Sequence, residues 1–293
     1  MRSFFSVHEY RHFFLRFAVF LVAGMCALAA YAQPRPDALQ PRYRLGIIPY
    51  ITPRGILDQF GPVSTGMSAA LNVPVKLETA PDYSSFEEAL AAEIYDIALI
   101  QPFEFYDVVE KRGYLPLARV SIPAMAQFFV RSDSKYKKIE DLRGTKLALP
   151  PALSASARMA LHVLFANNLV PGRDLAVHNY HANDSCLQQV WTNAASACVT
   201  AQPAIVNFER RMQASFRSIH DSQPIPNALF VVHPRVPAVQ RKKLEALLTG
   251  WSENAAGRAL LKRLGIPGLV PVRPGEYLVL RKYQNPPGSG ATR

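Results

Sequence analysis

The residues most able to do chemistry gather in the stretch Leu147–Leu161, LALPPALSASARMAL. A short apolar strand is stopped by two prolines, which have no N–H and fix φ. Ser154 and Ser156 follow, and then an Ala/Leu/Met run that predicts a helix. The first N–H groups of a helix lack partners within it and its dipole is positive there, so this layout predicts an anion site. The simpler alternative is that Ser154 only caps the helix.

Other candidates stand where expected strands end. Tyr50 follows a strand at 44–48, and its hydroxyl can donate to a ligand. Gln101 and Phe103 directly follow the apolar strand 96–100, and α/β sheets bind ligands at the carboxyl ends of their strands. Alternatively, Tyr50 is only an aromatic residue at the end of a strand, and Gln101 and Phe103 only form a turn.

His181 and Asp184 could complete a Ser-His-Asp set with Ser154 or Ser156, as in a secreted hydrolase. No G-x-S-x-G elbow accompanies them, so we do not expect an enzyme. His181 as a surface histidine, and Asp184 as the cap of a helix at 186–192, are the simpler alternatives. No Cys or His pair has metal-ligand spacing, and we expect neither metal nor cofactor.

The order of elements predicts an α/β fold of two lobes, each a mostly parallel sheet flanked by helices, joined by two crossover strands. Such lobes bind ligand in the cleft between them. The first lobe is expected from 43–125 and 223–284, the second from 126–222. Expected strands lie at 44–48, 73–77, 96–100, 115–122, 127–131, 146–149, 175–179, 197–200, 227–232 and 277–280, and expected helices at 56–71, 104–111, 186–192 and 237–264.

Residues 1–32 predict a cleavable signal peptide, with Arg residues before a 14-residue apolar run and a small-x-small site ending at Ala32. An uncleaved anchor is the alternative, but the run falls short of the roughly 18 residues that span a bilayer. We therefore expect a periplasmic protein, with a Pro-rich tether at 33–42 and a disordered tail at 285–293.

Cleavage would remove three Arg and one Glu, which lowers the net charge from +11 to +9. This charge suits steering of an anionic ligand. No basic run exceeds Arg241–Lys243, so nucleic acid is not expected. Cys186 and Cys198 form a disulfide or are two small buried residues, and the spacing alone leaves both open.

Several segments resemble, in order, the periplasmic phosphate/phosphite/phosphonate-binding proteins of ABC importers. They are RLGIIPY, PDYSSFEEALAAEIYDIALIQPFEFYDVVEKRGYLPLA, KIEDLRGTKLALP, HANDSCLQQV and QPIPNALFVV, within about Tyr43–Leu248. The resemblance implies the type 2 periplasmic binding protein fold. It also implies a monomer that captures a small oxyanion and delivers it to an ABC permease in the inner membrane.

In that family a Ser-Thr-Ser-Gly turn holds the anion, and the matching residues here are Ser154, Ala155, Ser156 and Ala157. The threonine hydroxyl is lost, and Ala157 lacks the freedom of glycine to adopt φ > 0.

The resemblance also implies ligand contacts from Tyr50, Tyr83, His181 and Asp184, with the aspartate suited to a cationic part of the ligand. The alternative for Tyr83 is packing at its helix start. Two other functions stay open: a sensor component that signals to a membrane partner such as a kinase, and a binding protein for a sulfonate or a vitamin precursor.

Overall fold

The computed structural model describes residues 43–283. The expected signal peptide, tether and tail lie outside these residues. Within 43–283, no helix combines the length and the apolar character needed to cross a bilayer.

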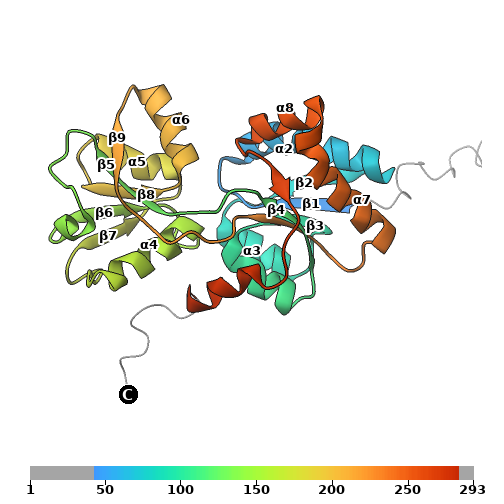
Figure 1. The fold of residues 1–293 in the computed structure, drawn as a ribbon, viewed down its shortest axis with the longest axis horizontal. Coiled ribbons are helices and arrows are strands. Elements are labelled where there is room, and N and C mark those ends of the chain that lie inside the picture. The colour runs from blue at the N-terminus through green and yellow to red at the C-terminus, as the bar shows by residue number, and fades with distance from the viewer. Residues whose placement is uncertain (1–42, 284–293) are drawn as a thin grey trace, which may run out of the picture. The chain divides into compact units, whose positions relative to one another are not determined.

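The first sheet has six strands in the order β11-β4-β10-β3-β1-β2. Their bounds are β1 Tyr43–Ile47, β2 Val75–Thr79, β3 Ile97–Ile100, β4 Leu115–Val120, β10 Leu229–Val232 and β11 Leu269–Val270. Four helices belong to this part of the chain (Figure 1): α2 Pro53–Leu71, α3 Tyr83–Ala91, α7 Ala238–Thr249 and α8 Ala255–Leu264.

This sheet is mixed. Strand β1 pairs in parallel with β2 and β3, whereas the returning strand β10 runs antiparallel between β3 and β4. All four residues of β10 are buried, as are all four of β3, which is typical of central strands covered on both faces. Strand β10 therefore joins the centre of this sheet after the chain has formed the second sheet.

The second sheet has five strands in the order β7-β6-β8-β5-β9. Their bounds are β5 Gln127–Arg131, β6 Lys146–Leu149, β7 Ala176–Asn179, β8 Ala197–Thr200 and β9 Phe216–Asp221. Its helices are α4 Ala155–Ala166, α5 Asn183–Trp191 and α6 Gln202–Met212. Strand β6 is parallel to β7 and β8, and β5 is antiparallel to β8 and β9. Sequence reasoning assigned no element to the segment that forms α6.

Cys186 and Cys198 form a disulfide with an S–S distance of 2.09 Å. It joins α5 to β8, and both residues are fully buried. The sequence separation of the two cysteines had left the disulfide open. In the fold their Cα atoms lie 5.6 Å apart, within the range of disulfides.

One expected helix is divided in the structure, and one expected strand is helical. The long helix at 237–264 is two helices, because Asn254 ends the intervening turn and caps α8 by accepting a hydrogen bond from the Gly257 N–H at 2.8 Å. The expected strand at 277–280 is part of a 3-10 helix, Glu276–Tyr283. That helix is held by tertiary contacts, with the Tyr277 hydroxyl donating to the Asn227 carbonyl at 2.6 Å.

The expected helix at 104–111 is also modified. A 3-10 turn, Pro102–Glu104, precedes a π-helical turn, Tyr106–Glu110. Such wide turns are often found at functional sites.

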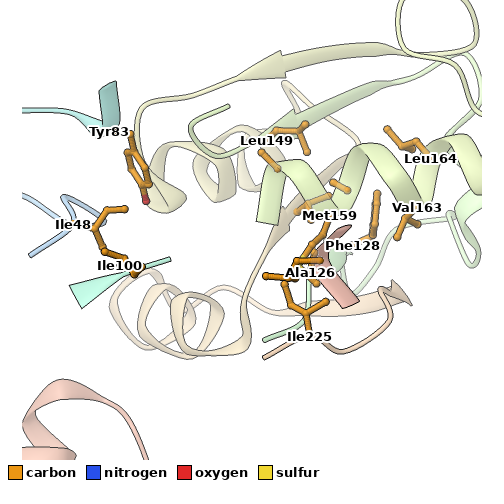
Figure 2. Packing of buried hydrophobic residues seen from close by; sticks show 14 of the residues in the cluster. Ile48, Tyr83, Ile100, Ala126, Phe128, Leu149, Met159, Val163, Leu164 and Ile225 are labelled. Carbon is orange, nitrogen blue, oxygen red and sulfur yellow. The ribbon is translucent and has the colours of Figure 1, made fainter. Parts of the chain in front are cut away.

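One buried hydrophobic cluster draws members from the neighbourhoods of both sheets. Figure 2 shows Ile48, Tyr83 and Ile100 from the first, and Phe128, Leu149 and Met159 from the second. The two sheets are therefore connected by packing as well as by the crossing chain.

Candidate functional site

The N-terminus of α4 is built as its sequence predicts. Ser154 is the N-cap, and its Oγ accepts a hydrogen bond from the Ala157 N–H at 3.3 Å. Ser154 is only 6% exposed. The capping role of this serine is thus confirmed, and its anion-binding role stays a prediction.

A side chain from the first sheet reaches this helix start. The Gln101 Oε1 atom, directly after β3, accepts a hydrogen bond from the Ala155 N–H at 2.8 Å. Ala155 is the first residue of α4, where the helix dipole is positive. An uncharged oxygen therefore occupies a position that an anion would also favour.

Glu104 lies one turn beyond Gln101 and is 6% exposed. Its Oε2 atom accepts a hydrogen bond from the Gln101 N–H at 2.9 Å. Burial raises the pKa of this carboxyl to about 8, so it is mostly neutral at neutral pH. Sequence reasoning missed Glu104, although a lone glutamate in the apolar run QPFEFY just after a strand is a usable signal.

Of the two expected tyrosines, Tyr83 lies near this carboxyl, and Tyr50 lies near Tyr83. Tyr83 is the first residue of α3, after the cap Asp82, and is 9% exposed. Burial raises the pKa of Tyr83, and Glu104 and Tyr50 raise it further because both are negatively charged at the high pH where Tyr83 would ionise. Burial likewise raises the pKa of Tyr50 to about 12. Both phenols are therefore neutral donors near pH 7, although the Tyr50 hydroxyl here donates to Gln59 Oε1 at 3.1 Å.

One face of α4 contacts elements of the first sheet along its length. One turn after Ser154, the Arg158 guanidinium lies 5.6 Å from the ring centre of Phe103 and 3.7 Å from the Glu87 carboxylate. One turn further, the His162 ring lies 4.4 Å from that of Tyr283. Tyr283 in turn packs edge-on against Phe103 at 5.4 Å. Phe103 thus lies where α4 meets the first sheet.

His181 and Asp184 lie at the same edge of the second sheet, but their contacts are different. Strands β6 and β7 are parallel neighbours, so α4 and α5 start at one edge. His181 is exposed, and its Nε2 lies 3.3 Å from Ser185 Oγ. Asp184 forms an ion pair with Arg211 at 2.6 Å. Within the described residues, neither makes a hydrogen bond or an ion pair with Ser154 or Ser156.

Asp184 does not cap α5. The helix begins at Asn183, its cap position is held by Ala182, and Asp184 lies in the first turn. The Asn183 side chain instead accepts a hydrogen bond from the hydroxyl of Thr200, at the end of β8, at 3.0 Å. The start of α5 is therefore held to the sheet through Asn183.

Two helix-flanked sheets joined by crossing strands, with a helix start facing a strand end of the other sheet, define a type 2 periplasmic binding protein. The family model for the periplasmic substrate-binding protein of the ABC phosphonate transporter matches residues 45–277. The chain belongs to this family, and it is a periplasmic substrate-binding protein of an ABC transporter.

Solved structures share the fold at low sequence identity. One is a binding-protein component of an ABC phosphonate transporter from Pseudomonas aeruginosa, with 18% identity, coverage of 83% of this chain and 85% of that chain, and a TM-score of 0.72. PhnD1 from Prochlorococcus marinus, in complex with methylphosphonate, has 13% identity, coverage of 83% and 96%, and a TM-score of 0.73. The Escherichia coli aliphatic sulphonate binding protein SsuA has 14% identity, coverage of 83% and 85%, and a TM-score of 0.58. No curated protein matches the sequence.

Proposed function

We propose that this protein binds a small phosphonate-like oxyanion at the start of α4 and delivers it to an ABC permease. The observation that carries the proposal is the start of α4 at Ser154–Ala157, where the Ala155 N–H donates to the Gln101 side chain beside the other sheet. Membership in the phosphonate family supports the class of ligand. The shared fold of PhnD1, solved in complex with methylphosphonate, and of the aliphatic sulphonate binding protein SsuA supports a tetrahedral oxyanion as the ligand.

The helix start supplies the attraction for the anion. Its N–H groups are donors and its dipole is positive, so a buried Lys or Arg is not required. In this proposal the anion binds at this helix start beside the Gln101 oxygen, which keeps its hydrogen bond from the Ala155 N–H, and Ser156 adds a hydroxyl donor. The net charge of +9 after signal cleavage favours the approach of an anion.

The remaining expected contacts would form on binding. Tyr50 would exchange Gln59 for the ligand, and Tyr83 would donate from α3. His181 would close from the start of α5. Asp184 would contact a cationic part of the ligand only after leaving Arg211, which gives it the weakest support of the set.

We further propose that the signal peptide is cleaved and that the mature protein is a monomer. The permease is the partner that membership in this family supports. A sensor role would use the same fold with a membrane kinase in place of the permease. Loss of uptake of the bound oxyanion in a deletion strain, restored by the cloned gene, supports transport; unchanged uptake with lost ligand-dependent signalling supports sensing.

The ligand class is tested with the mature chain, residues 33–293. A thermal-shift screen with phosphate, phosphite, methylphosphonate, methanesulfonate and small cationic metabolites should show a raised melting temperature for at least one oxyanion, because ligand that binds only the folded state stabilises it. Calorimetry then gives the dissociation constant. Stabilisation by cationic metabolites alone, with no oxyanion bound at millimolar concentration, would refute the proposal.

A further inference from the structure

One short turn of the described chain contains buried polar atoms that make no hydrogen bond. Among residues 43–283, two buried side-chain atoms lack a hydrogen-bond partner, Gln101 Nε2 and Glu104 Oε1. Both belong to the same short turn after β3. An unpartnered buried polar atom costs about 1–3 kcal/mol, so two in one turn point to a missing partner.

We propose that Gln101 and Glu104 bind an oxygen of the anionic ligand, with Glu104 donating as a neutral carboxylic acid. This inference rests on the proposed function, because the anion is the one placed at the start of α4. It adds Glu104 to the ligand-binding residues that the sequence predicted.

The hydrogen bonds already present determine which atoms are free to bind. The Ala155 N–H requires the oxygen of the Gln101 amide, so the NH₂ group cannot turn towards it. The Gln101 N–H likewise occupies Oε2 of Glu104. What remains is one NH₂ group and one carboxyl oxygen. The Gln101 side chain is near enough to the carboxyl to favour its charged form, yet the two make no hydrogen bond.

The protonation state decides what this pair can bind. A neutral carboxyl carries an O–H donor, so together with the Gln101 NH₂ it presents two donors to one anion oxygen. A carboxylate would present only acceptors and would repel the anion. Burial of Glu104 raises its pKa to about 8, which keeps the donor form at neutral pH.

The neighbouring groups act in both directions. Glu87 on α3 raises the pKa of Glu104, and Arg158 on α4 lowers it. The phenol of Tyr83, also on α3, lies near the carboxyl and is itself neutral. From the turns packed alongside, the nearby titratable groups are Tyr106, Asp107 and Tyr283.

This pKa has a consequence for stability as well as for binding. The folded pKa is raised above the unfolded value of 4.5, so the folded protein holds a proton that the unfolded chain releases. The contribution of Glu104 to the free energy of unfolding is therefore greatest in acid and decreases as pH rises from about 4.5 to about 8. Glu104→Gln should melt higher than wild type at pH 7, by a margin that shrinks towards pH 5.

The experiment measures methylphosphonate and inorganic phosphate binding by calorimetry at pH 7 and pH 9. Glu104→Gln keeps a donor that does not titrate, and Glu88→Gln, an exposed residue on α3, is the matched control. Wild-type and control dissociation constants should increase about tenfold relative to that of Glu104→Gln between these pH values, as the neutral fraction decreases from about nine-tenths to one-tenth. Titration of the ligand itself cancels in this ratio.

Glu104→Leu removes the donor and should weaken binding at pH 7 about ten- to a hundredfold. If Glu104→Leu does not fold, the pH dependence of the dissociation constant of Glu104→Gln is sufficient to test the inference. A Glu104→Gln profile parallel to wild type overturns the inference, as does full affinity in Glu104→Leu. Wild-type binding that is lost in Ser156→Ala would then leave the proposed function standing, whereas no oxyanion binding by wild type refutes both.

Discussion

Ser154 and Ser156 stand two residues apart, and we predict separate roles for them. Ser154 is buried and its Oγ accepts from the Ala157 N–H, so it completes the helix. Ser156 is half-buried, and within the described residues its side chain makes no hydrogen bond. Replacing each by alanine should therefore change two different measurements.

For Ser154→Ala the expected loss is that of a helix cap, about 1 kcal/mol in the free energy of unfolding. For a domain of this size that lowers the melting temperature by about 2–4 °C. Ser156→Ala should change stability by no more than about 0.5 kcal/mol, as for other side chains without partners. It removes a donor to a charged oxygen, so it should raise the dissociation constant for the bound oxyanion about ten- to a hundredfold.

Differential scanning calorimetry gives the first quantity and titration calorimetry the second. Ser252→Ala, at an exposed serine far along the chain, is the matched control and should change neither. If both Ser154→Ala and Ser156→Ala bind the oxyanion as wild type does, the helix start is not the anion site and these serines are structural only.

Restoring the family turn with Ala155→Thr and Ala157→Gly should strengthen methylphosphonate binding in calorimetry; abolished binding of the native oxyanion would instead show that the missing hydroxyl makes room for it. Breaking the Cys186–Cys198 bridge by reduction should cost about 3 kcal/mol for its twelve-residue separation, read as a lower melting temperature, and two reactive thiols in the unfolded, unreduced protein would contradict the bridge. Mass spectrometry of the periplasmic protein should give an N-terminus at Gln33, and residues 1–32 intact in a membrane fraction would refute cleavage. Small-angle scattering should show a smaller radius of gyration with saturating oxyanion, and an unchanged radius under verified binding would argue against hinged lobes.

The sequence alone determined the local elements that carry the candidate site. An apolar run followed by prolines and a serine predicts a strand, a stop and a helix start, and the structure has β6, then Ser154 as cap, then α4. For α3 the sequence allows either Asp82 or Ser84 as the cap, and in the structure Asp82 is the cap. These features depend on backbone and side-chain hydrogen bonds between residues a few positions apart. The local sequence therefore predicts them.

Tertiary structure decided which of these elements meet. Strand β10 pairs with both β3 and β4, which lie more than 100 residues earlier in the chain. The local sequence of β10 does not predict these partners. The kind of helix formed at 276–283 depends on contacts with distant groups, including Asn227. The disulfide needed the approach of α5 to β8.

The same holds for the chemistry of the site. Glu104 is an ordinary acid in the sequence, and its burial in the folded protein is the main cause of the raised pKa that keeps it neutral. The hydrogen bond from Ala155 to Gln101 joins residues 54 positions apart in the chain. Desolvation and long-range pairing are properties of the folded environment rather than of residue type. The sequence can therefore draw attention to Glu104, but it cannot predict that the carboxyl is neutral.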